Sequence, residues 1–175
     1  IRLELELRKG NIPDTVIFYD GVNEVYSAFQ NGYAGAPQNL ENRKAEFNKK
    51  DKLNLRGYIF YSDTMTIIRG ISKRLIGNAK SEEKDIGSLG GEVVEVYFNN
   101  LEIAEALEKK YNFKSYFFWQ PVIYFSKPLT EGEKSVMLEN VRPLYEVTYS
   151  KMPKGEKNFY DISDSFEHVE ETVYI

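Results

Sequence analysis

The stretch TVIFYDGVN, residues 15–23, decides the expected fold. Its first five residues are a continuous run of β-branched, apolar and aromatic side chains, which is typical of a parallel strand buried on both faces. Asp20 and Gly21 end the run, and residues 22–30 then carry apolar side chains at helical spacing. The stretch therefore predicts a strand that turns sharply at Gly21 and presents the Asn23 side chain at the carboxyl edge of a sheet.

Further segments with strand character follow along the chain. Residues 115–125 predict a second buried strand, disturbed at Pro121 because proline cannot donate to a sheet ladder. Residues 172–175 predict the start of a third strand, whereas residues 159–168 predict a short helix or turn.

Helical and loop signals separate these strands. Besides residues 22–30, helices are expected at residues 1–9, 43–52, 63–77, 92–110 and 130–149. Pro143 falls inside the last of these and should kink or split it. Residues 31–42 and 78–91 are expected to be loops. The alternation predicts an α/β fold, a three-layer sandwich in which a parallel sheet is flanked by helices on both faces.

Composition limits the function classes. The chain has 175 residues and a net charge of −4 without a long basic run, which predicts one domain and argues against nucleic-acid binding. The apolar stretches are too short for a membrane span. The chain lacks cysteine and has one histidine, which excludes disulfides, cysteine nucleophiles and multi-histidine zinc sites. Neither a metal nor a cofactor is expected, and the composition leaves the compartment open.

Asn23 is the strongest candidate for chemistry. Gly21 permits the sharp turn, and the following helix places the Asn23 carboxamide near a positive helix end. A neutral N–H donor in that position is suited to holding a developing oxyanion. A Gly-x-Asn sequence also serves as an ordinary turn with a helix cap, and spacing alone favours that interpretation.

The segment VIFYDGVNEVYSAFQNG closely resembles the third conserved block of the SGNH hydrolases, the GDSL-type esterases. That block reads Gly-x-Asn-Asp, and Gly21 and Asn23 match it, while Glu24 stands in place of the usual Asp. The segment FFWQPVIYFSKPLTEGE resembles the next core strand and exit loop of a bacterial branch often linked to surface polysaccharides. The resemblance implies a flavodoxin-like sandwich in which Asn23 is an oxyanion-hole donor.

The resemblance also implies that residues 1–175 are an interior fragment of a single SGNH domain. The serine block is expected before Ile1, and the Asp-x-x-His pair after Ile175. The implied activity is hydrolysis of a small-molecule or carbohydrate ester, with an O-acylated carbohydrate as the expected substrate. Two alternatives stay open: a non-catalytic domain that binds a glycan or a protein, and acyl transfer to a sugar.

Other residues are weaker candidates. Asp20, Glu24 and Gln120 are expected at most to line or support the site, because each lies at or near the carboxyl end of a predicted strand. The loop at residues 31–42 follows Asn23 closely, and loops at this edge commonly set substrate choice. His168 is interpreted as a surface residue, since Asp-x-x-x-His is not the family spacing. The aromatic run at residues 116–119 is interpreted as core rather than as a sugar platform.

Overall fold

The structure, a computed structural model, describes residues 2–49, 85–125 and 127–174. It divides into two compact units, one of residues 1–38 and 86–175 and one of residues 39–85. In the second unit the structure describes α3, Leu40–Lys49, a polar helix that begins inside the predicted loop at residues 31–42. Among the described helices, none has the length and apolar character that crossing a bilayer requires.

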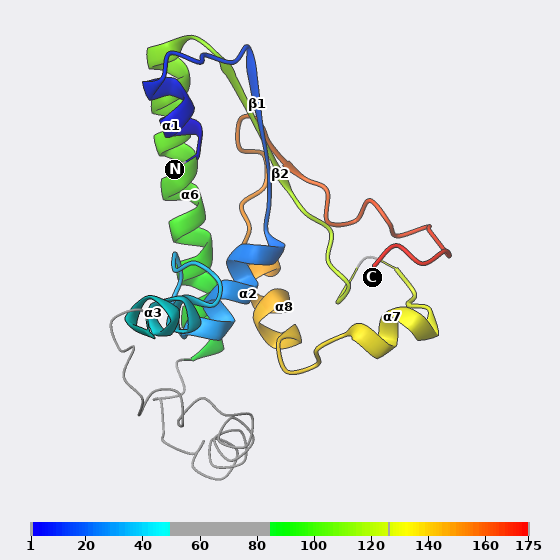
Figure 1. The fold of residues 1–175 in the computed structure, drawn as a ribbon. Helices are drawn as coiled ribbons and strands as arrows, with labels where there is room; N and C mark the ends of the chain where they lie inside the picture. Colours follow the sequence, from blue (N-terminus) through cyan, green and yellow to red (C-terminus); the bar gives the residue numbers. More distant parts are fainter. Residues whose placement is uncertain (1, 50–84, 126, 175) are drawn as a thin grey trace. The chain divides into compact units, whose positions relative to one another are not determined.

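The first unit contains a parallel sheet of three strands in the order β1-β2-β3 (Figure 1). The strands are β1, Thr15–Asp20; β2, Lys114–Trp119; and β3, Phe159–Asp161. The register sets Asp20 beside Trp119 and Trp119 beside Asp161, so the carboxyl ends of the three strands meet at one edge. The predicted α/β class with a parallel sheet is confirmed at this level.

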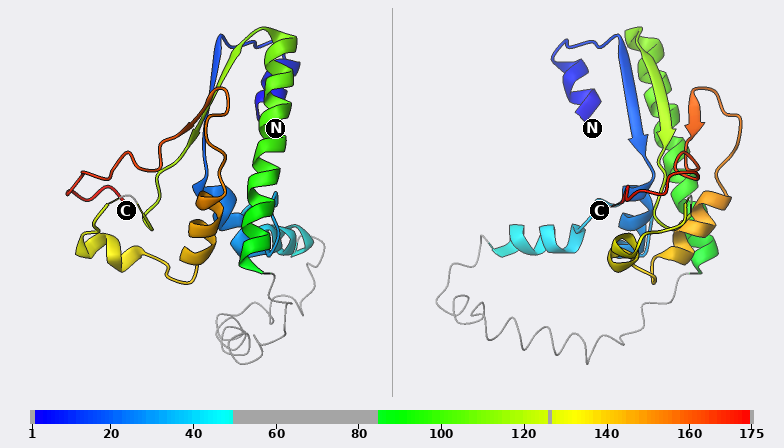
Figure 2. Two further views of the ribbon diagram at one scale, coloured as in Figure 1. Left: turned by 180° about the vertical axis from the view of Figure 1, so that it is seen from behind. Right: turned by 90° about the vertical axis from the view of Figure 1, so that its right-hand side faces the viewer.

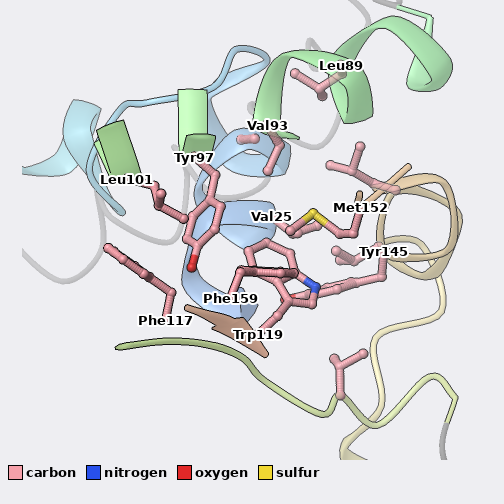
Figure 3. Packing of buried hydrophobic residues seen from close by; sticks show 14 of the residues in the cluster. Val25, Leu89, Val93, Tyr97, Leu101, Phe117, Trp119, Tyr145, Met152 and Phe159 are labelled. Carbon is pink, nitrogen blue, oxygen red and sulfur yellow. The ribbon is translucent and has the colours of Figure 1, made fainter. Parts of the chain in front are cut away.

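Three helices pack on one face of this sheet (Figures 1 and 2). They are α2, Val22–Asn31; α6, Ile86–Tyr111; and α8, Arg142–Ser150. Their apolar side chains meet Phe117 and Trp119 of β2 in one core, and the ring of Tyr97 lies edge-on to the Trp119 indole at 4.9 Å (Figure 3). The core thus lies next to the turn that follows β1.

The opposite face of the sheet is open within the described residues. Ile17 is 66% exposed and Tyr19 is 54% exposed, so the expectation that β1 is buried on both faces is wrong. On the same face Phe118 stacks on Tyr160 of β3, with ring centroids 5.2 Å apart. The aromatic run at residues 116–119 is therefore divided, with Phe117 and Trp119 in the core and the alternate residues on the open face.

Most predicted helices are present. The segment 1–9 forms α1, Arg2–Arg8, and the segment 130–149 is split as expected into α7, Glu131–Val136, and α8. The break precedes Pro143, which lies in the first turn of α8, where a backbone N–H is not needed. The helix predicted at residues 63–77 lies outside the described residues.

The third strand was predicted in the wrong place. Residues 172–174 form no strand because the backbone N–H groups of Val173 and Tyr174 donate to the Glu133 carboxylate instead. The strand that joins β2 is β3, inside the range predicted as helix or turn. Backbone hydrogen bonds at both of its ends hold it, from Phe117 N–H to the Asn158 carbonyl and from Ile162 N–H to the Trp119 carbonyl.

The loop expected at residues 78–91 is helical over its described end, because α6 already begins at Ile86. The glycines there signalled a loop, but Gly90 has a packing role. A Cβ at Gly90 would stand 2.8 Å from Cγ1 of Val147 in α8. Glycine therefore permits the close approach of α6 and α8, which a sequence pattern does not reveal.

Candidate functional site

The turn after β1 depends on Gly21. Its φ is +129°, a conformation that side-chain-bearing residues rarely adopt, and the residue is buried. A Cβ on Gly21 would stand 3.1 Å from the indole of Trp119. The absence of a side chain thus allows α2 to begin directly against the core.

Hydrogen bonds from three elements hold this turn. The Gly21 N–H donates to Oε2 of Glu24 at 2.6 Å, and the Val22 N–H donates to Oε1 of Gln120 at 3.3 Å. The Tyr145 hydroxyl of α8 donates to the Val22 carbonyl at 2.8 Å. Glu24 and Gln120, both predicted to line a site, therefore satisfy backbone donors at the start of α2.

Asn23 is the second residue of α2 and its side chain is exposed. Its Oδ1 accepts a hydrogen bond of 2.8 Å from Nε2 of Gln38. The Nδ2 group has no hydrogen-bond acceptor among the described residues. A donor at the first turn of a helix, just beyond the carboxyl end of a parallel strand, can bind an anionic or carbonyl oxygen.

A cavity of about 360 Å³ lies beside Asn23, between α2, the loop 34–38 and α6. Side-chain amides and a carboxylate give it polar groups, and small or branched apolar residues form its walls. The polar groups include those of Asn23, Glu24, Gln38 and Asn100, and the walls include Ala36, Pro37, Val93 and Val96. This volume is within the range of small-molecule sites.

Sequence reasoning missed Gln38 and Asn100, although it did point to the loop that carries Gln38. Both residues are far from Asn23 in sequence, so spacing gives no signal for them. The one sequence signal in this loop is its pair of glycines, at positions 32 and 35. In the structure both adopt left-handed conformations and turn the chain back towards α2.

Asp20 and Tyr97 add ionisable groups beside the turn. Burial raises the pKa of Asp20 to about 6, and the nearby negative charge of Glu24 acts in the same direction. Burial also raises the pKa of the Tyr97 phenol, helped by the charges of Asp20 and Glu24. The Tyr97 hydroxyl is buried without a hydrogen-bond partner in the described structure, and it is a neutral donor at physiological pH.

His168 is exposed in the turns that follow β3, and within the described part of the chain it makes no hydrogen bond or ion pair with Asp20, Asn23 or Glu24. Residues 2–49, 85–125 and 127–174 also contain no group of three His, Asp or Glu side chains placed to share a metal ion. The structure therefore brings together Asp20, Gly21, Asn23, Glu24 and Gln120, and it leaves the histidine apart.

No protein-family model matches the chain, and no curated protein or solved structure matches it either. What the described residues show is a mixed α/β unit with a small parallel sheet and helices packed beside it.

Proposed function

We propose that this chain supplies the oxyanion-binding part of a serine ester hydrolase that acts on an O-acylated carbohydrate. One observation carries the proposal. The exposed carboxamide of Asn23 stands at the first turn of α2, directly after the carboxyl end of β1, and its Nδ2 group has no acceptor among the described residues. The likeness of the surrounding sequence to the Gly-x-Asn block of SGNH hydrolases supports the same role.

In the proposed reaction a serine, activated by a histidine, attacks the ester carbonyl carbon and the carbonyl oxygen becomes an oxyanion. Asn23 donates an Nδ2–H bond to that oxygen, and the positive end of α2 adds to the stabilisation. Loss of the alcohol leaves an acyl-serine, which water hydrolyses. By resemblance, the serine and histidine lie outside residues 1–175.

A carbohydrate substrate is proposed on two grounds. The segment at residues 117–133 is similar to a bacterial branch associated with surface polysaccharides. The cavity beside Asn23 also holds the neutral side-chain amide of Asn100, a group that both donates to and accepts from sugar hydroxyls. If a sugar hydroxyl replaces water in the second step, the same residues support acyl transfer, and product analysis with a carbohydrate acceptor distinguishes the two.

A second candidate is a non-catalytic α/β domain that binds a glycan or a protein. A specific observation favours it: the Glu24 carboxylate lines the same cavity as Asn23, Asp20 adds a second carboxylate close to Glu24, and negative charge there opposes an oxyanion. Glu24 is partly neutralised by the Gly21 N–H, which reduces but does not remove this opposition.

An activity-based experiment on the full-length gene product separates the candidates. We expect a fluorophosphonate probe to label one serine and p-nitrophenyl acetate to be turned over, with prior labelling abolishing turnover. A folded protein that neither reacts with the probe nor hydrolyses the ester would contradict the hydrolase and leave the binding domain. Mapping the labelled serine by peptide mass spectrometry then identifies the nucleophile.

A further inference from the structure

We infer that Gln38 is a positioning residue that fixes which end of the Asn23 carboxamide faces the site, an inference that rests on the proposed function. A carboxamide has a donor end and an acceptor end, and rotation of the terminal torsion exchanges them. Nε2 of Gln38 donates to Oδ1 of Asn23 at 2.8 Å, which holds the acceptor end against the loop. The donor end, Nδ2, is then left to meet a substrate oxygen.

The loop is built to return Gln38 to Asn23. The ten residues of α2 span about 15 Å, so the chain must run back along the helix to bring Gln38 beside its first turn. Gly32 ends the helix in a left-handed conformation. The Asn31 side chain then donates to the Ser27 carbonyl at 2.7 Å and to the Pro37 carbonyl at 3.3 Å. This clamp holds the residue before Gln38 against the last turn of α2.

A second contact fixes the middle of the same loop. Gly35 has a φ of +78°, and a Cβ there would stand 3.3 Å from Cγ1 of Val96 in α6. Ala36 is buried next to it. The loop therefore lies against α6 as well as α2, and Gln38 approaches Asn23 from a backbone that packing restrains.

A local negative charge explains why such a constraint is needed. Glu24 lines the same cavity as Asn23, and its carboxylate, which already accepts from the Gly21 N–H, attracts N–H donors. Without Gln38, this charge favours turning Nδ2 of Asn23 away from the substrate. A single hydrogen bond of ordinary strength changes the population ratio of the two carboxamide orientations by about fivefold, which is enough to make the productive orientation dominant.

Two variants of opposite polarity test the inference in the full-length protein. Gln38→Lys keeps a donor for Oδ1, so we expect kcat to stay within about threefold of wild type. Gln38→Glu offers only acceptors, so it should draw Nδ2 of Asn23 towards residue 38 and away from the substrate. We expect this change to lower kcat by about 10²-fold with little change in KM. Equal losses in both variants, or a loss confined to KM, would overturn the inference.

A double-mutant cycle separates positioning from the added charge. If Gln38→Glu acts through Asn23, it should cause no further loss of kcat in an Asn23→Ala background. A full additional loss in that background would show that the new carboxylate acts on the substrate directly, and Gln38 would not be a positioning residue.

NMR tests the contact without any activity. In protein with labelled Asn and Gln side chains, we expect a through-hydrogen-bond coupling from Gln38 Nε2 to Asn23 Cγ. The reverse coupling, from Asn23 Nδ2 to Gln38 Cδ, would overturn the inference even in an active esterase. An inactive wild-type protein that shows the expected coupling would instead contradict the proposed function and leave the contact standing.

Discussion

Gly21 lies against the indole ring of Trp119, so close that a Cβ on Gly21 would stand 3.1 Å from Cδ2 and 3.2 Å from Cε2. This contact joins the turn that presents Asn23 to the centre of the core. The rings of Tyr97 and Tyr149 pack against the same indole, with centroids at 4.9 and 5.2 Å, so Trp119 cannot move aside without disturbing α6 and α8.

Gly21→Ala should therefore destabilise the protein strongly. The methyl group would stand 3.1 Å from the Trp119 indole, closer than an ordinary van der Waals contact, and an alanine is strained at a φ of +129°. We expect the free energy of unfolding to fall by about 3 kcal/mol in chemical denaturation followed by tryptophan fluorescence. Gly32→Ala is the matched control: its φ is +73° but its Cβ meets open space, so only the backbone strain applies. Equal losses in both variants would exclude the Trp119 contact as the cause.

Two adjacent glycines of α6 should respond in opposite ways to alanine. At Gly90 the new methyl group meets Val147 at 2.8 Å and Thr148 Oγ1 at 3.2 Å, so we expect a net loss of about 1–2 kcal/mol in the free energy of unfolding. At Gly91 the nearest atom is Nζ of Lys151 at 3.5 Å, and alanine should stabilise the helix by up to about 1 kcal/mol. Thermal denaturation of the two variants compares them directly, and a stable Gly90→Ala protein would contradict the packing described for α6 and α8.

Asp20 gives a prediction with a defined pH window. Its pKa is raised in the folded protein from 3.8 to about 6, so the native state binds the proton more tightly than the unfolded chain. Stability contributed by this group is therefore lost as pH rises from about 4 to about 6. Asp20→Asn removes the charge and keeps the shape, so the variant should be more stable than wild type at pH 7 by about 1 kcal/mol after solvent screening, and equal to it near pH 4.

Urea denaturation of the wild type and Asp20→Asn at several pH values measures this difference. Taking the difference between the two proteins cancels the titration of all other carboxylates. A stability gain that is the same at pH 4 and pH 7 would show that burial and Glu24 do not disfavour the Asp20 charge.

Glu133 should show the opposite dependence on pH. Burial alone would raise the pKa of Glu133, but hydrogen bonds from the backbone of Val173, Thr130 and Tyr174 and from Lys127 outweigh it and hold the pKa well below its usual range. The stability from this group is present above the unfolded pKa of about 4.5 and is lost as pH falls below it. The ion pair with Lys127 spans 3.1 Å and both side chains are fully buried.

Glu133→Gln should leave the Lys127 charge buried without an anionic partner and weaken the hydrogen bonds from the backbone of residues 173 and 174, because the amide oxygen that remains is a neutral acceptor and the new N–H₂ group opposes the Thr130 N–H. We expect the midpoint of thermal denaturation at pH 7 to fall by roughly 10 °C, with faster hydrogen exchange at Val173 and Tyr174. Glu131→Gln is a matched control on the same helix, because its ion pair with Lys134 is exposed. Unchanged exchange at Val173 and Tyr174 would contradict the role of Glu133 as the acceptor of their backbone N–H groups.

Local sequence patterns correctly predict the helices and strands that interactions between neighbouring residues determine. The apolar run at residues 15–19, the helical spacing after Gly21 and the Thr130 cap, whose Oγ1 accepts from the Glu133 N–H, are properties of neighbouring residues. Long-range partners decided the rest. Val173 and Tyr174 look like a strand, but the carboxylate of Glu133, forty residues earlier, takes their N–H groups. Gly90 alone favours a loop, but its close approach to Val147 of α8 explains why a glycine occurs inside a helix.

The same division applies to the candidate site. The placement of Asn23 after a glycine turn follows from the sequence, because strand, turn and helix are contiguous there. The roles of Glu24 and Gln120 do not, because each depends on which backbone N–H the turn presents to it. Gln38 was missed for a related reason: its contact with Asn23 exists only after the loop 32–38 has folded back along α2.

The kcat of Asn23→Ala with p-nitrophenyl acetate, measured in the full-length protein, tests the central claim most directly. Asn100→Ala is the control, since it removes another carboxamide that lines the same cavity. If Asn23 donates to the oxyanion, Asn23→Ala should lower kcat by about 10²–10³-fold with little change in KM, and Asn100→Ala should keep most of the activity. An Asn23→Ala protein with the kcat of the wild type would contradict the account.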